Sequence, residues 1–88
     1  MKYWVYILKS EKDSSFYIGY TNNLSRRLNQ HNAGKSRYTS KKLPWKIVYS
    51  EIFDSKTEAI RRELFLKKQR NKDFYESLIK NWSGSSAG

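Results

Sequence analysis

Two short runs rich in aromatic and β-branched residues follow one another near the start of the chain, at residues 3–10 and 16–21. Such runs are typical of β-strands, and the polar residues 11–14 between them are typical of a turn. Strands joined by so short a connection usually pair in opposite directions. The sequence therefore predicts an antiparallel hairpin, in which Tyr6 and Tyr17 lie on adjacent strands and can face the same way.

Helix signals follow the hairpin. Asn22 or Asn23 can cap a helix that runs to about Asn32, and Gly34 is placed to end it, since asparagine favours helix N-caps and glycine favours the position after a helix. Residues 35–43 are basic and have no regular period, so we expect a loop there.

The second half of the chain predicts one more strand and two more helices. Residues 45–53 read as a strand, and Ser55 with Glu58 forms a capping box that opens a helix running to about Gln69. A shorter helix is expected over about residues 72–80. The order β-β-α-β-α-α indicates an α/β fold of the α+β type, with a small three-stranded, antiparallel-type sheet flanked by helices.

A chain of 88 residues has room for one domain with one compact core. Its aromatic content of 16% makes such a core feasible, because each aromatic side chain buries a large area. The small residues at positions 83–88 predict a disordered tail, which leaves residues 1–82 as the domain.

The net charge of the chain limits the classes of partner that we expect. Eighteen Lys and Arg residues against eight Asp and Glu residues give a formal net charge of +10, which favours polyanions such as nucleic acid. A surface that is basic for solubility alone is the alternative. An anionic membrane would call for an amphipathic helix with a large exposed apolar face, and none is evident.

The absence of cysteine excludes disulfides and thiolate metal sites. The apolar run at residues 3–8 is followed at once by Lys9 and is too short for a signal sequence or a membrane span. We therefore expect a cytoplasmic protein with no membrane partner.

Two polar residues lie at the edge of the inward face of the first predicted helix. At about 100° per residue, Arg27 and His31 share one arc with two leucines, while Arg26 and Gln30 point elsewhere. A solvated helix charge and a satisfied polar edge residue are the simplest interpretations of Arg27 and His31.

The second predicted helix carries a carboxylate on its inward face. Its apolar arc is formed by Ala59, Ile60, Leu64 and Leu66. Glu63 falls in the middle of this arc, with Lys67 beside it. An exposed Glu63–Lys67 pair would contribute only a few tenths of a kcal/mol, whereas a carboxylate on an inward face is costly unless it is paired or binds a cation. A metal-binding role is therefore the alternative to an intrahelical ion pair.

Gly19 interrupts the second strand between Ile18 and Tyr20. A glycine inside a strand costs stability and often marks a bulge or a close backbone approach. For Tyr6 and Tyr17, core packing is the simplest interpretation, because tyrosine is a good strand residue.

Cations alternate with aromatic residues in and after the predicted loop. Cations suit phosphates and aromatic rings suit base stacking, so this segment is a candidate nucleic-acid surface, with a solvated loop as the alternative. Its candidate binding residues are Lys35, Arg37, Tyr38, Lys41, Lys42 and Lys46, followed closely by the ring of Trp45. Nothing resembles a base-reading helix, so we expect contacts to the nucleic-acid backbone.

The spacing of these residues resembles the GIY-YIG nuclease superfamily, and in particular its small standalone members. Residues 4–6 (Trp-Val-Tyr) are similar to the GIY motif, and residues 17–19 (Tyr-Ile-Gly) match the YIG motif. Arg27 and His31, four residues apart on the next helix, match the family pattern, as does Glu63 on a later helix.

The resemblance implies a role for each matching residue. Tyr6 and Tyr17 match the two tyrosines, one of which is thought to activate the attacking water. Arg27 matches the arginine that holds the scissile phosphate, and His31 matches a histidine found in many members. Glu63 matches the glutamate that ligates a single Mg²⁺ or Mn²⁺ ion.

Two positions depart from the family pattern. Trp4 stands where the GIY motif begins with glycine. The asparagine that follows the family's glutamate has no clear match, since Asn71 is too close to Glu63 and Asn81 lies near the tail.

The resemblance thus implies a metal-dependent endonuclease that hydrolyses phosphodiester bonds in DNA, with structured or damaged DNA in repair or recombination as its substrate. A non-catalytic nucleic-acid-binding module on the same fold and a basic adaptor for an acidic protein are the alternatives. We also expect a monomer or weak dimer, with a protein partner that supplies substrate choice.

Overall fold

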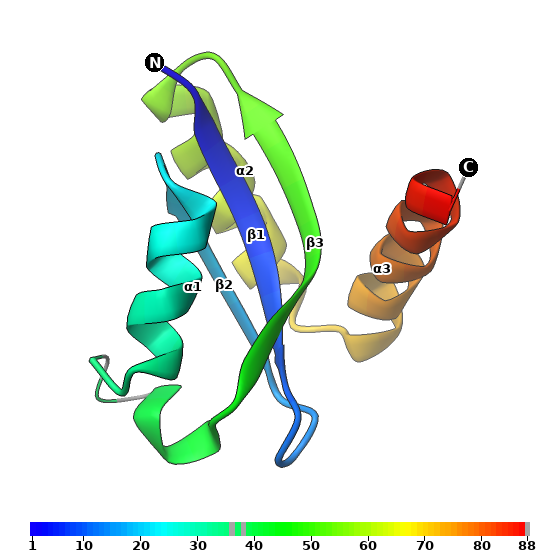
Figure 1. Ribbon diagram of the computed structural model, residues 1–88. Coiled ribbons are helices and arrows are strands. Elements are labelled where there is room, and N and C mark those ends of the chain that lie inside the picture. The colour runs from blue at the N-terminus through cyan, green and yellow to red at the C-terminus, as the bar shows by residue number, and fades with distance from the viewer. Residues whose placement is uncertain (36, 38, 88) are drawn as a thin grey trace.

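The computed structural model describes residues 1–35, 37 and 39–87, with the backbone alone for residues 83–87. Three antiparallel strands form one sheet in the order β2-β1-β3, and helices cover both of its faces (Figure 1). The predicted α+β architecture and the order β-β-α-β-α-α are confirmed, with one short 3-10 helix added.

The sheet places the two tyrosines of the hairpin on one face. Its strands are β1 (Tyr3–Ser10), β2 (Phe16–Thr21) and β3 (Trp45–Phe53). Between the central strand β1 and the edge strand β2, Tyr6 lies opposite Gly19 and Leu8 lies opposite Tyr17. Opposed residues share a face, and so do alternate residues of one strand. Tyr6 and Tyr17 therefore point the same way, as the hairpin predicts.

The helices begin and end where local signals place them. They are α1 (Leu24–Asn32), α2 (Lys56–Gln69) and α3 (Lys72–Ala87). The side chain of Asn23 caps α1 by accepting a hydrogen bond from the N–H of Arg26, and that of Ser55 caps α2 by accepting one from the N–H of Glu58. Gly34, with φ at 77°, follows α1 in the left-handed conformation that glycine tolerates best.

Two segments differ from their prediction. The basic loop contains a 3-10 helix, η1 (Thr39–Lys42), which is tied to β3 because the indole N–H of Trp45 donates to the carbonyl of Thr39. Helix α3 runs to Ala87, so residues 83–87 of the predicted disordered tail have helical backbone. A helix once formed gains a hydrogen bond with each added residue, and no proline stops this one. The division into a domain over residues 1–82 and a tail stays a prediction.

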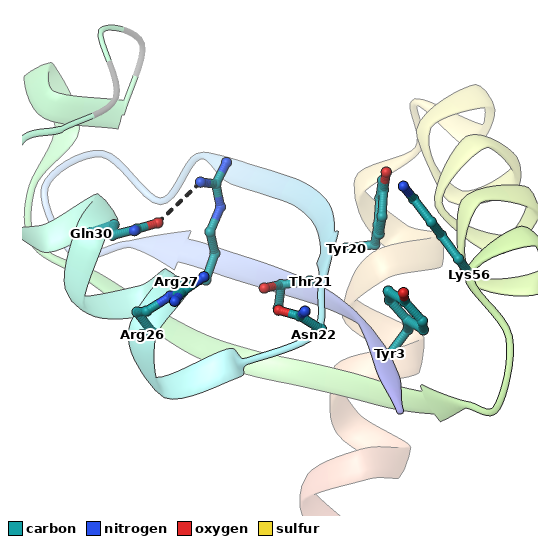
Figure 2. A pocket seen from close by; sticks show the side chains of 8 residues that line it. All are labelled: Tyr3, Tyr20, Thr21, Asn22, Arg26, Arg27, Gln30 and Lys56. Atoms are coloured by element: carbon teal, nitrogen blue, oxygen red, sulfur yellow. Dashed lines mark hydrogen bonds between the residues drawn. The ribbon is translucent and has the colours of Figure 1, made fainter. Parts of the chain in front are cut away.

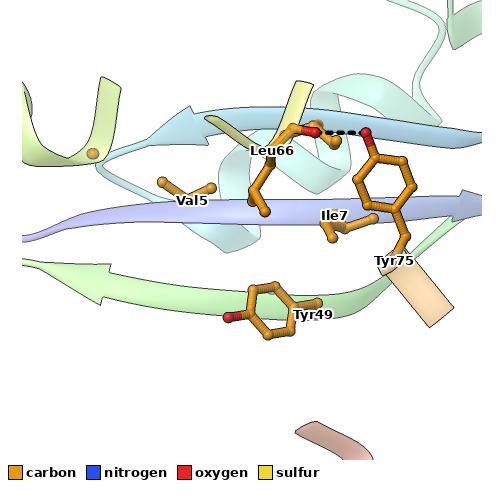
Figure 3. Close-up of a cluster of buried hydrophobic side chains, with 7 residues drawn as sticks. Val5, Ile7, Tyr49, Leu66 and Tyr75 are labelled. Carbon is orange, nitrogen blue, oxygen red and sulfur yellow. Dashed lines mark hydrogen bonds between the residues drawn. The ribbon is translucent and has the colours of Figure 1, made fainter. Parts of the chain in front are cut away.

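The larger core lies between the sheet and the helices α2 and α3. Val5 and Ile7 of β1 and Ala59 and Leu66 of α2 are fully buried in it. Tyr75 of α3 joins them, and its hydroxyl donates to the carbonyl of Leu66 at 2.6 Å (Figure 3). In the described part of the chain, no helix is both long and apolar enough to cross a membrane.

A smaller core lies on the opposite face of the sheet, beneath α1. Tyr6, Leu8 and Trp45 are buried there, and Leu24 and Leu28 of α1 pack against them. This packing holds α1 against β1 and β3, and it brings the polar edge of the helix to the hydroxyl of Tyr6.

Candidate active site

Tyr6 extends toward the backbone of the edge strand β2 at Gly19. Its side chain is only 2% exposed. A Cβ atom at Gly19 would lie 2.6 Å from the Tyr6 hydroxyl oxygen and 2.9 Å from its Cζ. The close approach predicted from a glycine inside a strand is confirmed, because only glycine leaves room for this phenol.

The two polar residues of α1 converge on the Tyr6 hydroxyl. Arg27 Nε donates to the phenol oxygen at 3.4 Å, and His31 Nε2 lies 3.3 Å from the same atom. Residues four apart lie on one face of a helix, so the predicted grouping of Arg27 and His31 is confirmed. Both side chains are drawn into the site, and neither is a solvated surface residue.

Tyr17 joins this group from β2. The centre of its ring lies 4.8 Å from that of His31 and 6.4 Å from that of Tyr6. The pKa of Arg27 is raised mainly by its hydrogen bond with Tyr6, and the charge and hydrogen bonding of Tyr17 add to this effect. Two phenols, one guanidinium and one imidazole therefore form a single cluster.

Tyr6 is a neutral phenol near pH 7. Burial is the main cause that raises the pKa of Tyr6 above its usual value, and the hydrogen bond from Arg27 opposes it. The charges of Tyr17 and Glu63 act in the same direction as burial. Arg27 is thus the cationic neighbour of this tyrosine, whereas the ammonium of Lys9 lies over an aromatic ring of β2.

Two further residues complete the cluster, and the sequence pattern identified neither. Thr39 of η1 is fully buried, and its Oγ1 lies 2.9 Å from His31 Nδ1. A neutral imidazole has one donor and one acceptor nitrogen, so the bond to Thr39 determines which of them Tyr6 meets. Thr39 gave no signal, because it stands in a segment without periodicity.

Gln30 is the second of these residues. The helical pattern placed it away from Arg27, and this was wrong. Its Oε1 accepts a hydrogen bond from Arg27 Nη1 at 3.2 Å (Figure 2). Neighbours three apart on a helix can meet, so the spacing offered a signal. The bond matters because it holds the guanidinium at a second point.

His31 predicts a pH dependence of stability. Burial, followed by the charge of Arg27, lowers the pKa of His31 below 6.5. Between the folded and unfolded pKa values the unfolded chain binds more protons, so stability rises with pH in that range. We expect full stability above about pH 7, with a loss as the pH falls below about 6.5. Urea unfolding across this range measures the effect, and His31→Gln should flatten it.

In this pH range the change in stability reports on the imidazole of His31. His31 is the only histidine of the chain, and the two carboxyls with lowered pKa, Asp13 and Asp54, titrate well below this range. An NMR titration that places the imidazole pKa at or above 6.5 would contradict the prediction.

Glu63 approaches the cluster from helix α2. Its side chain is 13% exposed, and the ammonium of Lys67 lies 3.4 Å from its carboxylate. The intrahelical ion pair is therefore present. The carboxylate also lies close enough to the cluster for its charge to raise the pKa of Tyr6. Leu64, which the helical pattern placed on the inward arc, is 50% exposed and lies outside the core.

The side chains around Glu63 do not form a site in which the protein alone supplies the ligands of a metal ion. Within the described residues, no three His, Asp or Glu side chains come together at a point where they could share an ion. Mg²⁺ is usually bound by one or two carboxylates, with waters and substrate phosphates as its other ligands. A single, mostly buried carboxylate whose charge reaches the cluster fits this mode of binding.

The predicted basic loop divides into three groups. Lys35 lines a cavity of about 230 Å³ together with Arg27, Gln30 and His31, so it borders the cluster. The side chain of Lys42 turns to the hairpin, where it pairs with Asp13 at 3.0 Å. Arg37, Lys41 and Lys46 are exposed, as Lys35 is, but they line neither the cavity nor the hairpin contact.

Neither aromatic residue of the loop is shown as a stacking surface. Tyr38 lies outside the described residues. The ring of Trp45 is buried, with only 2% of the residue exposed, so its predicted place among exposed aromatic residues was wrong. Its apolar ring packs in the smaller core, and its N–H is satisfied by Thr39.

One face of the three-stranded sheet carries two phenols, to which α1 adds an arginine and a histidine, and the helix α2 on the other face adds a glutamate, an arrangement that fits a nuclease-type catalytic domain. The chain belongs to the GIY-YIG family, because the GIY-YIG catalytic domain matches residues 2–76. The resemblance seen in the sequence is thereby confirmed, and membership supports a nuclease-type function.

The relatives are small proteins of similar length. A UPF0213 protein from Staphylococcus haemolyticus is 51% identical over 67 residues, which cover 75% of this chain and 80% of that protein. One from Streptococcus pneumoniae is 42% identical over 81 residues, which cover 91% and 81%. The solution NMR structure of a UPF0213 protein from Bacillus halodurans aligns with a TM-score of 0.55 and 37% identity, covering 91% of this chain and 84% of that one.

Proposed function

We propose that the protein is a metal-dependent endonuclease that hydrolyses phosphodiester bonds in structured or damaged DNA. The observation that carries this proposal is the convergence of Tyr6, Tyr17, Arg27 and His31 on one cluster beside a cavity. The charge of Glu63 reaches this cluster from another helix. These groups come from β1, β2, α1 and α2, so only the folded chain assembles them.

Arg27 is the group that binds the scissile phosphate. A guanidinium can donate two parallel hydrogen bonds to phosphate oxygens. Its bonds to Tyr6 and Gln30 hold the planar group in place before DNA arrives. A donor fixed in advance stabilises the negative charge that develops on the phosphate without first having to reorganise.

The two tyrosines have different tasks. Tyr6 is enclosed and neutral, and it positions Arg27 and His31 through its oxygen. Tyr17 is partly exposed, so of the two phenols it is the one nearer to solvent. We therefore assign to Tyr17 the orientation of the attacking water, and to Tyr6 the positioning of its two neighbours.

Glu63 would hold the divalent cation, Mg²⁺ or Mn²⁺. Its carboxylate supplies the hard oxygen that these ions prefer, and it lies within electrostatic range of Tyr6. A bound ion would stabilise the negative charge on the phosphate as a Lewis acid. Lys67 pairs with one oxygen of this carboxylate, Oε2, at 3.4 Å, so the ammonium and the cation would share Glu63 or compete for it.

The pair between Lys67 and Glu63 also favours a second candidate function. A carboxylate that is neutralised by its own helix is what a non-catalytic nucleic-acid-binding module would keep. Such a module would retain the cations around Arg27 and bind DNA without cutting it. The cytoplasmic location, a protein partner, and a monomeric or weakly dimeric state stay predictions.

One experiment separates these functions. Supercoiled plasmid is incubated with the protein in Mg²⁺, in Mn²⁺ and in EDTA, and DNA binding is measured in parallel. We expect nicked circles with either metal and none in EDTA. Binding without nicking in every condition would leave the binding module. If the protein has no affinity for DNA at low salt, only the basic adaptor remains.

A further inference from the structure

A cavity of about 320 Å³ opens at the end of β2, next to the catalytic cluster. Figure 2 shows its two sides, which are joined by the last residues of β2 and the start of the turn. One side is formed by Tyr3, Tyr20 and Lys56, and the other by Arg26, Arg27 and Gln30. We call it the flanking cavity, because Arg27 belongs both to it and to the cluster.

Helices α1 and α2 lie on opposite faces of the sheet, and each contributes to one side of this cavity at the sheet edge. Tyr3 and Tyr20 pack against the larger core, on the face that α2 covers, and Lys56 is the first residue of α2. Arg26 and Arg27 come from α1, on the opposite face. The edge strand therefore lies between a wall that carries two aromatic rings and a wall that carries two guanidinium groups.

The charge of the flanking cavity is positive. Three of the side chains that line it, Arg26, Arg27 and Lys56, are cations, and among its described lining residues none is acidic. Cations gathered in a concave site raise the local concentration of anions. A phosphate group is the anion that matches guanidinium groups best, because their geometries are complementary.

The aromatic wall points to a base as well as a phosphate. Tyr3 and Tyr20 are partly exposed, so their rings are accessible from the cavity. A base can stack on an aromatic side chain only when the face of the base is free, as it is in a single strand. A cavity of about 320 Å³ lies at the lower end of the range for small-molecule sites, roughly 300–1,000 Å³. It therefore has room for about one nucleotide.

The cavity continues from the catalytic cluster. Arg27 and Gln30 line both the flanking cavity and the smaller cavity that His31 and Lys35 border. A DNA strand that places a phosphate on Arg27 therefore has a cavity on each side of it. The neighbouring nucleotide on one side then faces the flanking cavity, between the side that carries Tyr20 and Lys56 and the side that carries Arg26.

We propose that the flanking cavity binds an unpaired nucleotide of DNA next to the scissile phosphate. Its base stacks on Tyr20 and Tyr3, and its phosphate is held by Arg26 and Lys56. The inference rests on the proposed nuclease function of the Arg27 cluster, and it narrows the substrate. DNA with a single-stranded segment beside the cut, such as a flap or an overhang, is preferred to a continuous duplex.

The test measures binding in EDTA, so that no cleavage is needed. Fluorescence anisotropy compares a blunt DNA hairpin with the same hairpin carrying a short single-stranded overhang. We expect the wild type to prefer the overhang. Tyr20→Leu should lower that preference by about tenfold, the scale of one lost stacking contact, and Tyr20→Phe should retain it. Lys56→Ala should weaken binding of the overhang and reduce its salt slope by about 0.7.

Lys80→Ala is the matched control, because it removes the same charge from an exposed position on α3. It should leave the preference and the salt slope unchanged. Tyr20 packs against the larger core, so thermal unfolding of Tyr20→Leu is measured first, and Lys56→Ala repeats the test at a surface position. If both variants lower the affinity for the two hairpins equally, or lower neither, the inference is overturned.

The outcome is independent of the nicking assay. A preference for the overhang that depends on Tyr20 and Lys56, in a protein that cuts no plasmid, would support the flanking cavity and remove the nuclease. Metal-dependent nicking without any such preference would keep the nuclease and remove the cavity.

Discussion

Replacing Glu63 by glutamine is expected to reduce metal-dependent nicking of plasmid by about a hundredfold or more, the scale of losing one preorganised charged group. Glutamine preserves the shape of the side chain but removes the charge that would hold Mg²⁺ or Mn²⁺. The fold should survive, because the pair with Lys67, which is half exposed, contributes less than about 0.5 kcal/mol. Nicking rates and urea unfolding of the two proteins measure both effects.

Glu76→Gln is the control for this variant, since Glu76 is an exposed glutamate of α3 and the chemical change is identical. Its nicking rate should equal that of the wild type. DNA binding by Glu63→Gln should be equal or slightly tighter, because the change adds one unit to a net charge of +10. Wild-type nicking by Glu63→Gln would remove Glu63 from the site.

A second measurement tests metal binding by Glu63 through the unfolding temperature, without cleavage. A ligand that binds only the folded state raises the unfolding temperature. Mn²⁺ should therefore stabilise the wild type, and the effect should be lost in Glu63→Gln. Equal stabilisation of both proteins would place the cation elsewhere on the chain.

The fold was predictable because its signals are local. Asn23, Ser55 and Gly34 mark helix ends by the hydrogen bonds and the backbone conformation that these residue types favour. The register of the hairpin follows from its short turn and its alternating side chains. Helix α3 runs further than predicted, because a composition of small residues only weakly disfavours a helix that has already formed.

The site was predictable only in part, because its polar contacts join distant segments. Arg27 and His31 share a helix face, so their proximity could be derived from spacing alone. Thr39 meets His31 only because η1 folds back over α1, and no local pattern encodes that contact. The Lys67–Glu63 pair was predicted as an alternative to a metal site, and the structure contains the pair without excluding the site.

Asn71 is a further residue whose role could not be read from the sequence pattern. It was one of two candidates for the asparagine that follows the family's glutamate. In the structure its side-chain oxygen accepts hydrogen bonds from the N–H groups of Asp73 and Phe74, so it caps α3. A capping asparagine is tied to a helix end and is an unsuitable ligand for the cluster. The presence of Asn71 is therefore explained by its role at the start of α3, and it is not the asparagine of the family pattern.

Gly19→Ala is expected to destabilise the protein and to disable the site. A methyl group 2.6 Å from the Tyr6 hydroxyl forces the phenol to move, and His31 and Arg27 enclose it. Overpacking of this kind costs about 1–3 kcal/mol. Alanine also restricts the unfolded chain, which returns about 0.4–1 kcal/mol, so the net effect is a loss. For a domain of this size each kcal/mol lowers the unfolding temperature by about 4–8 °C.

The effect on activity should be larger than the effect on stability. A displacement of about 1 Å in a catalytic site can cost a hundredfold in rate, and Tyr6 positions both Arg27 and His31. Nicking well below the unfolding temperature should therefore fall by about a hundredfold. Gly34→Ala is the control, because among the residues that the structure describes a Cβ there meets only Ser40, at 3.9 Å. Its φ of 77° makes alanine strained, so it should lose stability but keep its nicking rate.

A double-mutant cycle tests whether the clash with Tyr6 is the cause. Tyr6→Phe removes the oxygen at 2.6 Å but leaves Cζ at 2.9 Å, so the cost of Gly19→Ala should shrink without vanishing in that background. Residues in direct contact show coupling energies of about 0.5–3 kcal/mol. If the two changes are additive in urea unfolding, the loss arises from the β2 backbone, and Gly19 is not what makes room for the Tyr6 hydroxyl.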